Sequence, residues 1–179
     1  MTTLRPMDED ELLAVYGTRP PTEALPRIRE FLDALAREGA AADTLSMKLL
    51  CVHLFNAGSV DDVLRIWRAK ESSRDADAAI DVRLLCGAGL DVTKAHLARD
   101  GSDEARAALD HITACEAAGD FEEFDPESET AYFEHWYRGE VLSSDDDVPS
   151  PAAARRPTTR SALGSLDSIM RRWRRPRRP

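Results

Sequence analysis

Glycines recur along this chain at the ends of segments that carry the apolar spacing of an α-helix, and this rhythm restricts the fold more than any other feature. They are Gly39, Gly58, Gly87, Gly89, Gly101, Gly119 and Gly139. Between them, apolar residues recur three or four positions apart, which places them on one face of a helix. Glycine often ends a helix because it adopts the left-handed conformation without strain. The pattern predicts an all-α domain over residues 22–140, preceded by an N-terminal arm or short helix over residues 1–21.

Start and stop signals predict where the helices of this domain lie. The expected helices cover residues 22–38, 42–56, 60–70, 75–86, 91–99, 102–118 and 125 to about 139. Thr22 is expected to cap the first helix, and the pair Asp125 and Pro126 is typical of a helix start. In the second helix Leu45 is expected on the inward stripe. In the third, the inward residues are Val63, Ile66 and Trp67.

The spacing of these helices predicts helical hairpins, at about two helices per ~40 residues. In such an array each pair of helices buries its apolar face against the next pair. No strict repeat consensus is visible in the sequence. An irregular bundle and a short α-solenoid are therefore both compatible with the pattern.

Two segments are similar to ankyrin repeats. Residues 49–64 read LLCVHLFNAGSVDDVL, and residues 84–92 read LLCGAGLDV. Ankyrin repeats pair a helix ending in glycine with a second helix that ends in Leu-Leu-x-x-Gly-Ala-Asp-Val. The repeat's Thr-Pro-Leu-His motif is absent here, and Leu90 interrupts the turn motif. The resemblance implies a helical-hairpin array, indicates no site and supports no family assignment.

Residues 79–97 admit a second interpretation, as the strand, glycine loop and helix of a nucleotide-binding unit. Ile80, Val82 and Leu84 alternate before a Gly-Ala-Gly turn. A dinucleotide fingerprint needs a third glycine where the chain has Val92, and no phosphate-loop motif is present. No other segment supplies the strands of a parallel sheet. We therefore interpret Gly87 and Gly89 as the end of one helix, with Asp91 capping the next.

The cysteines and histidines are the candidates for metal binding or catalysis. Cys51, Cys86 and Cys115 are odd in number and lie among apolar residues, so we expect buried reduced thiols. His111 and Cys115 share a helix face, whereas Cys51 and His53 point about 200° apart on a helix. There is no Cys-x-x-Cys pair, and partly exposed histidines beside core cysteines explain these residues without a metal. No cofactor and no metal are assigned.

Charge divides the chain into two parts. Residues 1–142 carry 15 Lys or Arg against 29 Asp or Glu, a net charge of −14, whereas residues 143–179 carry nine against four, a net charge of +5. The Ser, Pro and Asp content of residues 141–160 predicts a disordered linker. Residues 161–179 predict a basic amphipathic helix, with an apolar stripe beside arginines. The residues expected to bind are Leu163, Leu166, Ile169, Met170, Arg171, Arg172, Trp173, Arg174 and Arg175.

The segment from residue 121 to residue 137 holds six of the chain's 11 aromatic residues. Such a segment can cover the end of a helical core. Alternatively, it can expose an aromatic groove for a peptide, because interfaces are enriched in aromatic residues. The residues of this possible groove are Tyr132, Trp136 and Tyr137.

Together these features predict a noncatalytic interaction or regulatory protein. Its basic tail is expected to dock on a partner protein or on an anionic membrane, and nucleic acid is not favoured for an acidic body. Neither a signal peptide nor a membrane-spanning run is visible, which predicts a cytoplasmic protein, peripherally membrane-bound if the tail binds lipid. The alternative is a small enzyme or metal protein that uses His96, His111 or the cysteines.

Overall fold

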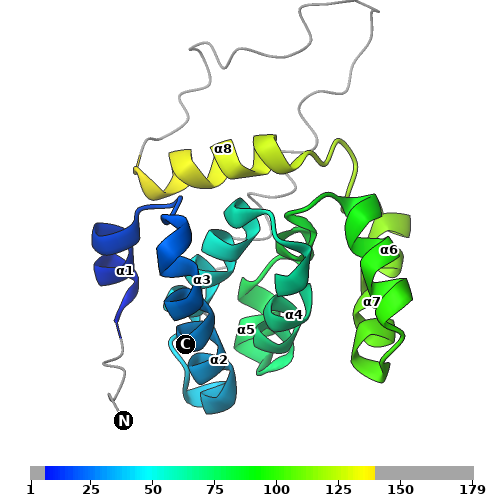
Figure 1. Ribbon diagram of the computed structural model, residues 1–179, viewed down its shortest axis with the longest axis horizontal. Helices are drawn as coiled ribbons and strands as arrows, with labels where there is room; N and C mark the ends of the chain where they lie inside the picture. Colours follow the sequence, from blue (N-terminus) through cyan, green and yellow to red (C-terminus); the bar gives the residue numbers. More distant parts are fainter. Residues whose placement is uncertain (1–6, 140–179) are drawn as a thin grey trace, which may run out of the picture. The chain divides into compact units, whose positions relative to one another are not determined.

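The computed structural model describes residues 7–139, and all regular structure in this range is helical (Figure 1). The α-helices are α1 (Glu9–Tyr16), α2 (Leu25–Glu38), α3 (Thr44–Ala57), α4 (Val63–Glu71), α5 (Arg74–Ala79), α6 (Leu90–Asp100), α7 (Asp103–Ala117) and α8 (Pro126–Tyr137). Short 3-10 helices are η1 (Thr22–Ala24), η2 (Gly39–Ala41), η3 (Val60–Asp62) and η4 (Val82–Cys86). The all-α prediction is confirmed.

Successive helices pack as hairpins, with α2 against α3, α4 against α5, and α6 against α7. Figure 1 shows these pairs side by side in chain order, while α8 crosses one end of them. Helix α3 is central, because α1, α2, α5 and α8 all pack against it. As a result every residue from Ser46 to Phe55 is buried. Three of these residues, Ser46, Lys48 and His53, are polar, and a buried lysine and histidine are rare in a helix buried all round.

Several helix starts agree with their predicted signals. Ser102 caps α7 through a bond from the Ala105 amide, and Asp125 caps α8 in the same way, ahead of Pro126. The predicted cap at Thr22 is wrong, because a 3-10 turn begins there and α2 starts only at Leu25. Pro26, the second residue of α2, has no backbone N–H that could donate to the Thr22 carbonyl four residues earlier. The Leu25 amide donates to that carbonyl instead, which gives the tighter turn.

The predicted single helix over residues 75–86 is also wrong. The chain turns extended at Ile80 and Asp81, between α5 and η4. The Asp81 carboxylate accepts from the Arg83 amide at 2.9 Å, which starts a new helical turn. Buried Lys70 donates through Nζ to the carbonyls of Asp77 and Ile80, at 2.7 and 3.0 Å, and so satisfies carbonyls at the end of α5.

Two further details differ from expectation. Gly89, at φ 98°, is the N-cap of α6, and Asp91 lies in the first turn rather than capping it. Leu45 is 55% exposed instead of facing the core, because Ser46 and Met47 form the buried side of the first turn of α3 and Leu45 lies on its solvent side. The predicted inward residues of α4, Val63, Ile66 and Trp67, are buried. None of the helices in residues 7–139 is long and apolar enough to cross a membrane.

Candidate functional site

The most unusual side chain of the described domain is Lys48, which is only 7% exposed in the second turn of α3. Its Nζ lies 5.5 Å from the centroid of the Trp136 ring on α8, a cation–π contact. Burial lowers the pKa of Lys48 to about 8, and the negative charges of Glu9 and Asp81 oppose this shift. A lysine retained in this setting costs stability, and such residues often mark functional sites.

Helix α1 brings Glu9 to the same place. Burial raises the pKa of the Glu9 carboxyl, while the charge of Lys48 lowers it. The Tyr137 hydroxyl of α8 is buried next to this carboxylate without a hydrogen bond of normal geometry among the described residues. Its pKa is raised by burial and by the Glu9 charge. We call Glu9, Lys48, Trp136 and Tyr137 the Lys48 cluster.

Helix α8 is held against the domain by polar and aromatic contacts. Arg83 of η4 pairs with Glu129 at 2.7 Å, with both side chains mostly buried, and its Nε donates to the Asp120 carbonyl at 2.5 Å. The Thr130 hydroxyl donates to the Asn56 side chain of α3 at 2.9 Å. These contacts determine where Trp136 lies, because they fix the helix that carries it. The cluster is therefore built by tertiary packing of three helices.

The aromatic residues predicted to line a groove have different environments. Trp136 is 46% exposed and stacks with Tyr132, whose ring centroid is 6.4 Å away. Tyr132 also meets Phe133 edge to face. Tyr137 is partly buried, and its hydroxyl lies inside the domain beside Glu9. Of the three side chains Trp136 is thus the most accessible, and the groove itself stays a prediction.

His53 differs from the expectation of partly exposed histidines, because it is fully buried. Its Nε2 lies 2.7 Å from the Gly17 carbonyl, at the end of α1, and Tyr16 packs edge-on against its ring. Since the carbonyl accepts, Nε2 carries the proton, and Nδ1 has no partner in the described chain. Burial lowers the pKa of His53. Helix α1 covers this residue, which the spacing within α3 alone does not reveal.

The other metal and catalytic candidates are dispersed. Cys51 and Cys86 are buried free thiols, and burial raises the pKa of both, that of Cys86 to about 12. A thiol with a raised pKa is a poor nucleophile and ligand. His111 lies 3.8 Å from the Cys115 sulfur and packs on Trp67, whereas His96 lies on α6 beside Arg99. Within residues 7–139 no three His, Cys, Asp or Glu side chains are grouped to hold a metal.

Sequence reasoning missed Lys48 and Glu9. The available signal is a lysine inside the apolar run LSMKLLCVHLF, residues 45–55, where a buried helix is expected. The predicted binding residues of the tail, from Leu163 to Arg175, lie outside the described residues. No family model, curated protein or solved structure matches this chain.

Proposed function

We propose that this chain is a noncatalytic helical interaction protein that acts in the cytoplasm by binding a partner protein. One observation carries the proposal, namely the separation of charge along the chain. The described domain, residues 7–139, has 14 Lys or Arg against 28 Asp or Glu, a net charge of −14, whereas the nine cations of residues 143–179 are all arginine. Opposite charges in separate parts of one chain favour specific association with charged partners.

The buried ionisable groups of the domain support a binding role over a catalytic one. Asp62, 1% exposed, accepts from Arg29 on α2 and Arg65 on α4, each at 2.8 Å. Arg83 and Glu129 join η4 to α8 in the same manner. These pairs hold helices together. The charged side chains of these pairs thus serve the packing of the helices.

The arginine-rich tail is the second support. The apolar stripe that the sequence predicts there, with Leu163, Leu166 and Trp173, would be unused if the arginines bound phosphates alone. A protein groove uses the stripe and the charges together, as in the recognition of amphipathic helices. We therefore favour a protein partner over a membrane surface.

The test compares the full-length protein with a variant whose tail charges are removed, R171Q/R172Q/R174Q/R175Q. Both would be crosslinked in extracts of the native cell, and both would be sedimented with phosphatidylcholine vesicles containing phosphatidylserine. We expect a protein partner that the variant captures at least about tenfold less, since each desolvated charge contact contributes on the order of 1 kcal/mol. Salt-sensitive sedimentation of the wild type alone would assign the tail to the membrane. Equal behaviour of both proteins in both assays would contradict the proposal.

A further inference from the structure

Cys115 is the most accessible of the three cysteines in this chain. It is partly exposed, whereas Cys51 and Cys86 are buried. A thiol reacts when a reagent can reach the sulfur and when the sulfur can lose its proton. Burial prevents the first condition at Cys51 and Cys86 and opposes the second, because it raises the pKa of both thiols. Reactivity of this chain through sulfur therefore depends on the surroundings of Cys115.

A base lies next to the Cys115 sulfur. His111 and Cys115 are four residues apart on α7 and so share one face of the helix. The His111 Nε2 lies 3.8 Å from the Cys115 Sγ, a hydrogen-bond contact for sulfur. An imidazole in this position can accept the thiol proton and leave a thiolate beside an imidazolium. We call His111 and Cys115 the thiol–imidazole pair.

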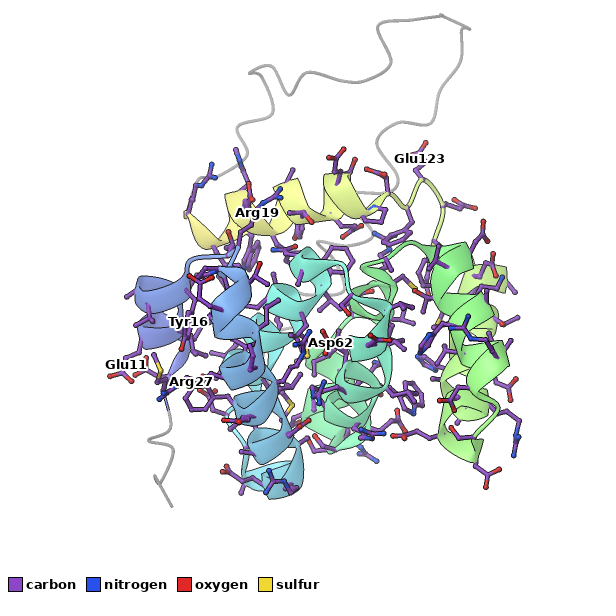
Figure 2. All side chains as sticks on the ribbon, viewed as in Figure 1. Glu11, Tyr16, Arg19, Arg27, Asp62 and Glu123 are labelled. Carbon is purple, nitrogen blue, oxygen red and sulfur yellow. The ribbon has the colours of Figure 1, made fainter. Side chains whose placement is uncertain are left out.

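Helix α4 holds the imidazole of this pair in place. Helix α7 packs against α4 as well as α6, and side chains fill the space between α4 and α7 (Figure 2). There the buried Trp67 ring lies 5.3 Å from the His111 ring, centroid to centroid. This contact restricts rotation of the imidazole, so its Nε2 stays directed at the Cys115 Sγ. A thiol, a base and a group that orients the base are the parts of an activated nucleophile.

The charged groups that flank the thiol–imidazole pair form two ion pairs. Lys94 of α6 pairs at 2.6 Å with Glu116, the residue after the cysteine. Arg68 of α4 pairs at 2.6 Å with Glu104. Each cation reduces the repulsion that its carboxylate would exert on a thiolate. The thiol lies in the last turn of α7, where the helix dipole opposes a thiolate and favours an imidazolium, so ionisation of the thiol depends on the imidazole beside it.

We infer that Cys115 is a modification site that forms a mixed disulfide with a low-molecular-weight disulfide, and that His111 is the base for this step. The imidazole takes the thiol proton, and the thiolate attacks one sulfur of the disulfide. A new S–S bond forms while the S–S bond of the small molecule breaks. The released thiolate takes the proton from the imidazolium, so Cys115 is oxidised and half of the small molecule leaves as a reduced thiol.

The number of donors favours covalent modification over metal binding. Within residues 7–139 no third His, Cys, Asp or Glu side chain joins the thiol–imidazole pair to hold a metal. Zinc sites use three or four protein ligands. A small disulfide needs only a thiolate and a proton acceptor, and the pair supplies both. The inference is independent of the proposed function, because it concerns α7 and not the partner that the charged parts of the chain bind.

The test follows the reaction of the folded, full-length protein with dithiobis(nitrobenzoic acid), a disulfide that releases a coloured thiolate. Mass spectrometry of the digested protein identifies which cysteine is labelled. We expect Cys115 to react at least about a hundredfold faster than Cys51 and Cys86 at pH 7, because the buried thiols react only when the fold opens.

His111→Gln removes the base and keeps a polar side chain. We expect it to slow labelling of Cys115 at pH 7 at least about tenfold, since the thiol then ionises at a helix C-terminus without an imidazolium beside it. The pH profile distinguishes a base from a packing residue. The wild-type rate should level off below about pH 8, whereas the His111→Gln rate should still rise at about pH 8.5, where an isolated thiol is half ionised.

His96→Gln is the matched control, because His96 lies on α6 beside Arg99. It should be labelled at the wild-type rate. Slow labelling of the two buried cysteines in each variant shows that the variant is folded. The inference is overturned if Cys115 reacts no faster than the buried cysteines, if the wild-type rate levels off only above about pH 8.5, or if His111→Gln and His96→Gln react alike.

Discussion

At the scale of single residues, the polar side chains buried in α3 determine how this domain responds to pH. His53 is neutral in the fold, because its Nε2 donates to Gly17 and its Nδ1 lies in a site without a partner in the described chain. Protonation would place a charge there that nothing offsets. Burial lowers the pKa of His53, so the folded state binds fewer protons than the unfolded state below about pH 6.5.

We therefore expect His53 to destabilise the fold as the pH falls below about 6.5, by up to about 1.4 kcal/mol per pH unit until the folded pKa is reached. Glu9 and Glu129 act in the opposite direction, because their raised pKa values favour the folded state as the pH falls toward 4.5. Urea unfolding of the wild type and His53→Gln between pH 8 and pH 5 isolates the histidine. A wild type that loses no more stability than the variant would contradict this expectation.

Lys48 gives a second prediction, for stability at neutral pH. Its pKa is lowered from 10.5 to about 8, which corresponds to about 3 kcal/mol of destabilisation when it is charged. That penalty is full below pH 8 and disappears as the pH rises toward 10.5. Lys48→Met keeps the apolar stem, so we expect it to stabilise the protein by about 1–3 kcal/mol at pH 7.

Guanidinium chloride unfolding at pH 7 and pH 10 measures this effect. The advantage of Lys48→Met should shrink at the higher pH, where the wild-type amine is neutral. Lys94→Met is the matched control, since Lys94 is only partly buried and pairs with Glu116. We expect it to change stability by less than about 1 kcal/mol at either pH. A destabilised Lys48→Met would show that the attraction of Glu9 and Asp81 outweighs burial.

At the scale of elements, the glycine pattern predicted where the hairpins lie. It did not show why each position requires a glycine. Gly87 was interpreted as a helix end, yet its φ of −59° is open to any residue. A Cβ there would lie 2.4 Å from the Phe55 carbonyl oxygen and 2.9 Å from the Phe55 Cα. Gly87 therefore permits η4 to pack closely on the end of α3, a contact between segments 32 residues apart.

Gly87→Ala should consequently destabilise the fold by about 2–4 kcal/mol, because backbone must move to admit the methyl group. Gly101 is the matched control, with φ +68° and nothing within 4 Å of its added Cβ. Gly101→Ala should cost only about 1–2 kcal/mol, from its left-handed backbone. Thermal unfolding of both variants ranks them, and a less stable Gly101→Ala would contradict the role assigned to Gly87.

The break between α5 and η4 shows what periodicity misses within an element. Ile80, Val82 and Leu84 are buried, and both a strand-like and a helical pattern fit them. The chain forms neither a continuous strand nor a continuous helix there, because Ile80 and Asp81 are extended between α5 and η4. Lys70, ten residues before Ile80, supplies the donors that satisfy the end of α5. The apolar spacing of neighbouring residues cannot predict a contact with a residue ten positions away.

At the scale of the whole molecule, the negative charge of residues 7–139 opposes compaction. Many of its ion pairs, such as Arg68 with Glu104, are exposed and contribute little each. We therefore expect repulsion to dominate the salt response, so that raising NaCl from 20 to 300 mM stabilises the domain by about 1 kcal/mol. Urea unfolding at both concentrations measures this. Asp110→Asn should raise stability at low salt more than at high salt, and a fall in stability with salt would contradict the expectation.

The sequence alone determined the fold class, most helix positions, the helix starts at Ser102 and Asp125, and the division of charge. These features arise from neighbours within about four residues, so local spacing is enough to predict them. Only the tertiary structure decided that Lys48, Glu9 and Trp136 meet, that His53 is covered by α1, and that Leu45 stays exposed. Those environments depend on which helices surround α3. Burial and the pKa values it shifts are therefore properties of the packed domain and not of the local sequence.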